Sequence, residues 1–109
     1  MPAAYKVLGQ SNPSATTATT LYTVPASTSA VVSSITIANL AATATTYRVA
    51  VRPAGATLAN QHYLAYDAAL PANDTTILTI GLSLATTDIV TVYAGSANVA
   101  FNLFGTEIT

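Results

Sequence analysis

Charged side chains are scarce in this sequence. Of its 109 residues, three are basic and four are acidic, so 6% are charged, against roughly 25% in an ordinary soluble domain. The surface is therefore expected to consist mostly of Thr, Ser, Asn, Ala and backbone groups. Such a surface has little self-repulsion to keep copies of the chain apart. This composition favours packing against other protein chains in an oligomer or a larger assembly.

The same scarcity excludes several classes of partner. Three basic side chains cannot supply the roughly six to ten phosphate contacts of a typical DNA-binding protein, so we expect no nucleic-acid partner. No apolar run approaches the ~18 residues of a membrane helix, and the N-terminus lacks the basic and apolar segments of an export signal. We therefore expect no membrane partner and synthesis in the cytoplasm. Cysteine is absent, which excludes a disulfide framework.

Groups that carry out catalysis or hold metals are almost missing. His62 is the only histidine, and no Gly-x-Ser-x-Gly segment supplies a nucleophile for it. The four acidic residues have no metal-ligand spacing. Asp74 and Asp88 directly precede predicted strands, where such side chains cap turns by accepting hydrogen bonds from backbone N–H groups. The sequence therefore predicts no enzyme activity, no catalytic residue, no metal site and no cofactor.

The residues that are abundant favour β-strands. Thr, Val and Ile fit a pleated surface, and apolar residues alternate with polar ones instead of recurring at helical spacing. The clearest case is Thr45–Arg52, which predicts a half-buried strand. Its two faces are Tyr47, Val49 and Val51 on the core side, and Thr46, Arg48, Ala50 and Arg52 on the other.

Further strands are predicted at regular spacing between Pro, Gly, Asn and Asp turn signals. They are Ala4–Leu8, Leu21–Val24, Val31–Ala38, Gln61–Tyr66, Thr75–Ile80, Ile89–Ala94 and Asn98–Phe104. Seven or eight short strands separated in this way predict an all-β fold, an antiparallel β-sandwich or a jelly-roll-like arrangement. Periodicity alone does not distinguish the two, because it contains no strand order.

The chain divides into two parts by composition. Residues 11–20 form the segment of lowest complexity, rich in Ser, Ala and Thr. We therefore expect an N-terminal strand and extended arm over residues 1–20, and a single β-sandwich domain over residues 21–109. The low-complexity segment is either an exposed connection or an arm that adds to a neighbouring subunit.

Six tyrosines stand out against two phenylalanines and no tryptophan. Tyrosine offers a large contact area with one polar tip, which suits interfaces and sugar stacking. Alternation places Tyr63 and Tyr66 on opposite faces of one strand, and it favours Tyr22 and Tyr47 as core residues. The candidate interface residues are Tyr63, Tyr66, His62, Arg48 and Arg52.

Several blocks occur in a recognisable succession. They are Leu21-Tyr22-Thr23-Val24-Pro25-Ala26, Ala30-Val31-Val32-Ser33-Ser34-Ile35, Asn39, Pro71-Ala72-Asn73-Asp74-Thr75, Thr87-Asp88-Ile89-Val90 and Glu107-Ile108. From Leu21 to the C-terminus this succession resembles small β-sandwich virion structural proteins of tailed bacteriophages, including cyanobacterial phages. The resemblance implies a non-enzymatic role in a virus particle, with no catalytic residues to transfer.

The sequence and the resemblance together predict a virion protein made in the host cytoplasm. We expect a capsid decoration (cement) protein that forms homo-oligomers and bridges major capsid subunits, or else a tail, collar or baseplate component that contacts tail proteins. The alternative outside the structural proteins is a carbohydrate-binding host-adhesion module, with Tyr63, Tyr66 and His62 as the platform on which a sugar stacks.

Overall fold

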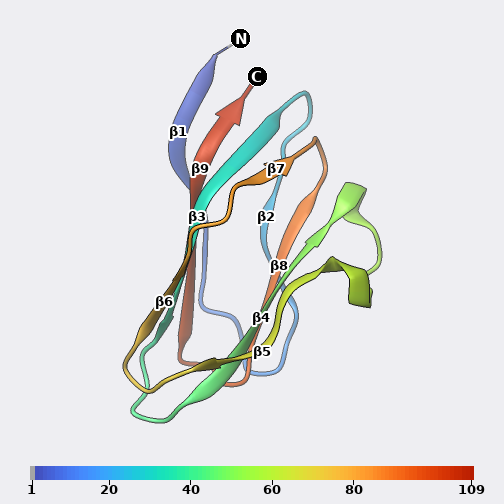
Figure 1. Ribbon diagram of the computed structural model, residues 1–109. Helices are drawn as coiled ribbons and strands as arrows, with labels where there is room; N and C mark the ends of the chain where they lie inside the picture. Colours follow the sequence, from blue (N-terminus) through green and yellow to red (C-terminus); the bar gives the residue numbers. More distant parts are fainter. Residues whose placement is uncertain (1) are drawn as a thin grey trace.

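The computed structural model describes residues 2–109, and these residues form two antiparallel sheets that face each other (Figure 1). The first sheet has the order β1-β9-β3-β6, with β7 also paired to β3, and the second has the order β2-β8-β4-β5. The strands are β1 (Ala3–Ser11), β2 (Thr19–Thr23), β3 (Ser29–Asn39), β4 (Thr45–Arg52), β5 (Tyr63–Leu70), β6 (Thr75–Leu78), β7 (Leu82–Leu84), β8 (Ile89–Ala94) and β9 (Val99–Ile108).

The strand order is that of a jelly roll. The chain pairs β1 with β9, β2 with β8, β3 with β6 and β7, and β4 with β5, so it forms a nested hairpin whose arms wrap over both sheets. Strands β6 and β7 lie along different parts of β3 and together fill one strand position. The predicted all-β sandwich is therefore confirmed, and the structure adds the strand order that periodicity could not supply.

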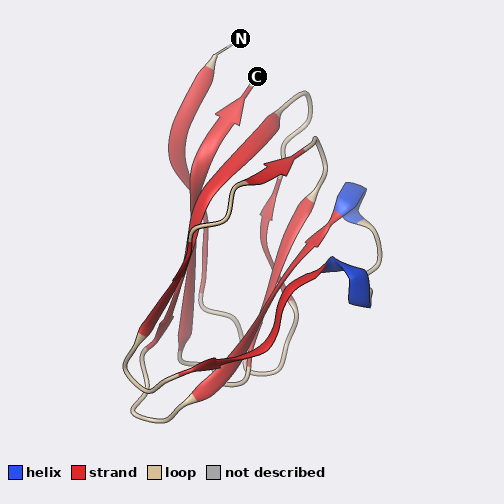
Figure 2. Ribbon diagram, in the orientation of Figure 1, coloured by secondary structure: helices blue, strands red, loops and turns tan. Residues whose placement is uncertain are grey.

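Helical structure in the described chain amounts to two short 3₁₀ turns, η1 (Pro53–Gly55) and η2 (Asn60–His62), in the connection between β4 and β5 (Figure 2). The strand expected at Gln61–Tyr66 therefore begins only at Tyr63, because η2 occupies its first positions. Neither turn approaches the length that a helix needs to cross a bilayer.

The core lies between the two sheets and is built mainly by alternation along the strands, with interruptions at the register shifts. In β4, Tyr47 and Val49 are buried, as predicted, and Arg48 lies on the opposite, outer face. Tyr22 is also buried, as predicted. The largest fully buried side chains come from both sheets: Val24, Val32, Ile35, Ile37, Val49, Leu70, Val90, Val92, Val99, Phe101 and Leu103.

The N-terminal residues belong to the first sheet. Strand β1 is the sheet's outermost strand and pairs with β9 along its length, and Leu8 contributes to the core. The low-complexity segment after β1 lies along the same body, since Asn12 donates hydrogen bonds to two backbone carbonyls, those of Ala97 and Val99, and the Thr16 N–H donates to Ala94. The two chain ends lie side by side (Figure 1).

Candidate functional site

A row of stacked side chains crosses the outer face of the second sheet. Arg48 is the neighbour of Tyr93 on β8, and its guanidinium carbon lies 4.1 Å from the centroid of the Tyr93 ring. On its other side, the same carbon lies 4.0 Å from the centroid of the Tyr66 ring. Arginine over an aromatic ring is an attractive cation–π arrangement, so the three side chains hold one another in place.

A bulge in β5 completes this arrangement. The register between β4 and β5 shifts between Tyr47, which pairs with Ala68, and Val49, which pairs with Ala65. Tyr66 and Asp67 therefore lie together opposite the one residue Arg48. Asp67 has a positive φ of 50°, and its carboxylate accepts two hydrogen bonds from Arg48, at 2.7 and 3.3 Å. The hydrogen bond from Arg48 lowers the pKa of Asp67. Hydrogen bonding to Asp67 in turn raises the pKa of Arg48.

The bulge also corrects the prediction for Tyr63 and Tyr66. Simple alternation placed the two rings on opposite faces, and this is wrong, because the irregular register of β5 brings them into contact. Their ring centroids are 4.8 Å apart and their planes meet at 83°. Together with Asn60 they line an open cleft of about 340 Å³, which we call the aromatic cleft.

The remaining candidate residues, His62 and Arg52, have local roles of their own. The Nδ1 atom of His62 accepts a hydrogen bond from the Ala59 N–H at 3.0 Å and closes the turn η2. Arg52 donates to the Thr91 hydroxyl at 3.0 Å and to the Ala56 carbonyl at 3.1 Å. The structure therefore brings Arg48, Tyr63 and Tyr66 together in one site. His62 and Arg52 make their polar contacts elsewhere.

The two aspartates at turns behave as predicted. Asp74 accepts a hydrogen bond from the Thr75 N–H, and Asp88 accepts from the N–H groups of Ala54 and Ala85, each at 2.8 Å. Asp88 thereby ties η1 to the turn before β8. Within residues 2–109, no group of three or more His, Cys, Asp or Glu side chains is arranged to hold a metal ion.

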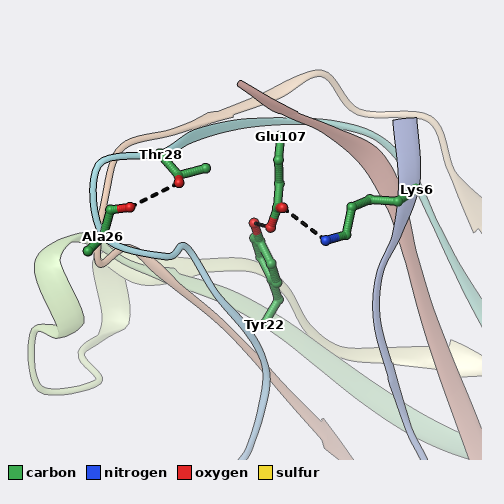
Figure 3. Close-up of polar contacts among 5 residues, drawn as sticks. All are labelled: Lys6, Tyr22, Ala26, Thr28 and Glu107. Carbon is green, nitrogen blue, oxygen red and sulfur yellow. Dashed lines mark hydrogen bonds and ion pairs between the residues drawn. The ribbon is translucent and has the colours of Figure 1, made fainter. Parts of the chain in front are cut away.

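A second polar cluster, which the sequence reading missed, joins the two sheets at the end where the termini meet (Figure 3). Glu107 on β9 accepts a hydrogen bond from the hydroxyl of Tyr22 on β2 at 2.5 Å, and another from the ammonium of Lys6 on β1 at 2.9 Å. The hydrogen bond from Tyr22 has the largest effect in lowering the pKa of Glu107, and the bond from Lys6 lowers it further. The pKa of Tyr22 is raised, mainly by burial and also by the hydrogen bond to Glu107.

The outer face of the first sheet has the opposite character. In the cross-strand register, Tyr5 lies opposite Thr106, which lies opposite Val31, while Val7 lies opposite Phe104. Tyr5 is 86% exposed, and Val7 and Val31 are also exposed. We call Tyr5, Val7, Val31 and Phe104 the outer apolar patch.

The charged side chains of the described chain all lie elsewhere. Lys6 and Glu107 pair at the end of the sandwich, on the side of the first sheet that faces Tyr22 of the second, with the Lys6 side chain 48% exposed. Arg48, Arg52 and Asp67 belong to β4 and β5 of the second sheet. Asp74 and Asp88 are in turns. Of the residues that the register assigns to the outer face of the first sheet, none is formally charged. The outer face of this five-stranded sheet therefore presents an uncharged surface, with the outer apolar patch across β1, β9 and β3.

Comparison with known proteins gives no relative from which a role could be transferred. No protein-family model matches the chain, and no curated protein or solved structure is significantly similar to it. The functional argument consequently rests on the surfaces described above.

Proposed function

We propose that this protein is a non-enzymatic structural protein of a tailed-bacteriophage particle, most specifically a capsid decoration protein. The observation that supports this proposal most strongly is the outer face of the first sheet, which combines exposed apolar side chains with the absence of formal charge across its described residues. Contiguous apolar surface of this kind marks protein interaction sites. The resemblance noted in the sequence points to the same class of protein.

The chemistry of this face restricts its partner. A partner that placed charged side chains against it would bury those charges without counterparts, at a cost of several kcal/mol per group, an order-of-magnitude figure. The proposed partner is therefore a capsid subunit that presents an equally uncharged surface. Tyr5 is the anchor residue of the contact, because large exposed tyrosines contribute much of the binding energy at protein interfaces.

The free edge of β1 supports the second part of the proposal, the homo-oligomer. Strand β1 pairs with β9 on one side only, so its other side presents unpaired backbone donors and acceptors. Edge strands are commonly blocked by charged residues, prolines or bulges. In β1 the one charged side chain, Lys6, is paired with Glu107, and the register shift comes only after Val7, which leaves the edge before it regular. We propose that two copies of the chain associate along the N-terminal half of β1.

The mechanism of a decoration protein is to add binding free energy. A rigid sandwich that contacts two neighbouring capsid subunits binds the assembled lattice and not its separated parts, and so stabilises the assembled state by mass action. Particles that lack the protein should then assemble but burst at a lower temperature or under a smaller osmotic shock. Equal robustness of particles with and without the protein would contradict the proposal.

A tail, collar or baseplate component is the alternative within the same class. The uncharged outer face of the first sheet is compatible with either role, so surface chemistry does not separate them. Quantitative mass spectrometry of purified particles does: a decoration protein should be present in hundreds of copies, since it follows the capsid lattice, whereas a tail or baseplate protein should be present in far fewer. Absence of the chain from particles would contradict both roles.

A further inference from the structure

We propose that the aromatic cleft on the second sheet, lined by Asn60, Tyr63 and Tyr66, is a binding site for a neutral saccharide. This inference goes beyond the structural role proposed above and does not depend on it. The aromatic cleft and the outer apolar patch lie on different sheets, so either surface can serve without the other. A particle-bound protein with both surfaces would attach through one and present the other outward.

The two tyrosine rings form a corner. They meet at 83° with their centroids 4.8 Å apart, and Tyr66 is 57% exposed. A sugar ring that packs its C–H groups against one tyrosine brings its ring-edge hydroxyls to the other. A cleft of about 340 Å³ lies at the lower end of the range of small-molecule sites, which suits a terminal or short saccharide.

The polar groups at the cleft are available to a ligand. Among the described residues, the amide of Asn60 and the hydroxyls of Tyr63 and Tyr66 have no side-chain hydrogen-bond partner, and none of them is a buried unsatisfied group. They therefore face solvent. An amide and a phenol each offer both a donor and an acceptor, which matches the hydroxyl groups of a sugar.

Charge at the cleft favours a neutral ligand. The cation beside it, Arg48, gives two hydrogen bonds to Asp67, so its donors on that side are occupied and its charge is compensated. The lining residues themselves are uncharged. An acidic sugar would find no free cation among the lining residues, and a basic ligand would find no free carboxylate there.

The site is also held rigid before any ligand arrives. Arg48 packs against Tyr66 on one side and Tyr93 on the other, with its guanidinium carbon 4.0 and 4.1 Å from the two ring centroids, while Asp67 fixes its orientation. Arg48 thus acts as a positioning residue for Tyr66. A ring that is already fixed loses little conformational freedom on binding, which favours affinity.

A proline-rich peptide is the main competing ligand, because such peptides also dock on aromatic-lined grooves. An extended peptide needs a groove several residues long, whereas this cleft is lined by three residues at a corner. A flat aromatic ligand would favour two parallel rings, and these rings are nearly perpendicular. The geometry therefore favours the saccharide.

The test begins with an array of neutral mono- and oligosaccharides, together with sialylated and sulfated glycans and a proline-rich peptide. Neutral hits are then titrated into ¹⁵N/¹³C-labelled protein up to tens of millimolar, and resonances of Asn60, Tyr63 and Tyr66 are followed by NMR. We expect saturable shifts confined to the cleft. Tyr66→Ala should weaken binding at least about tenfold, since it removes the stacking surface, and Tyr66→Phe should retain most of it.

Two further variants keep the outcome clear. Asn60→Ala leaves both rings in place and should weaken binding several-fold, so it tests the cleft even where Tyr66→Ala disturbs the fold. Leu40→Ala, at an exposed position in the turn after β3, should bind like the wild type. The inference is overturned if no neutral saccharide shifts the NMR resonances of the cleft residues. It is also overturned if acidic glycans or the peptide bind more strongly than neutral saccharides, or if Asn60→Ala and Tyr66→Ala both bind like the wild type. None of these outcomes bears on particle copy number, which tests the structural role separately.

Discussion

The hydroxyl of Tyr22 donates a hydrogen bond to the carboxylate of Glu107 at 2.5 Å, across the space between the two sheets. Tyr22 belongs to β2 of the second sheet and Glu107 to β9 of the first. Elsewhere between the sheets the contacts are mainly apolar. This bond is therefore a directional link at the end of the sandwich where both termini lie.

Removing that link should lower stability without opening a cavity. Tyr22→Phe keeps the buried ring, so the change reports the hydrogen bond itself. We expect a loss of about 1.5–3 kcal/mol in the free energy of unfolding, as is typical of hydrogen bonds to charged groups, measured by urea denaturation. Tyr47→Phe is the matched control, because Tyr47 is also buried but has no side-chain hydrogen bond to a described residue. It should change stability by only a few tenths of a kcal/mol.

The same cluster predicts a dependence of stability on pH. Hydrogen bonds from Tyr22 and Lys6 lower the pKa of Glu107 below its usual 4.5. As the pH falls, Glu107 is therefore protonated at a higher pH in the unfolded chain than in the folded chain. The stabilisation by the carboxylate is complete above about pH 4.5 and is lost as the pH falls through the lower folded pKa.

Glu107→Gln should remove this dependence. The variant should be less stable than the wild type at neutral pH, and the difference between their melting temperatures should shrink as the pH falls to about 3. Asp67 also has a lowered pKa, so both proteins should keep some acid sensitivity. A constant difference across this pH range would show that the charge of Glu107 does not contribute.

Gly105 marks a place where two strands approach too closely for a side chain. A Cβ atom there would overlap the backbone carbonyl oxygen of Val31 and crowd the side chain of Leu8. Gly105→Ala should therefore cost about 1–3 kcal/mol, the usual range for overpacking, as measured by thermal or urea unfolding. In Gly81→Ala the added Cβ meets nothing within 4 Å, so this control should stay within about 0.5 kcal/mol of the wild type. Equal stability of the two variants would contradict the register of β3 and β9.

The sequence predicted those features that follow from local pattern. The alternation in Thr45–Arg52 predicted a strand with Tyr47 inside and Arg48 outside, and the structure confirms it. The turn roles of Asp74 and Asp88 were also predictable, because an aspartate just before a strand bonds to nearby backbone N–H groups.

Features that depend on pairing between distant strands could not be predicted. The neighbour of Arg48 on β8 is Tyr93, and this relation is set by the register between β4 and β8, which no local pattern contains. The contact between Tyr63 and Tyr66 depends on a bulge whose only sequence signal is Asp67, a residue type that tolerates a positive φ. Tyr22 was predicted as a core residue, but its partner Glu107 lies 85 positions away.

The central claim is that the uncharged face of the first sheet binds the particle. The direct measurement is the binding of purified protein to particles from which it has been removed genetically, using the wild type, Tyr5→Lys and Leu64→Lys. Tyr5 lies in the outer apolar patch, and Leu64 is exposed on the opposite sheet. We predict that Tyr5→Lys, folded and as stable as the wild type, fails to bind, and that Leu64→Lys binds fully. Full binding by Tyr5→Lys would contradict the claim.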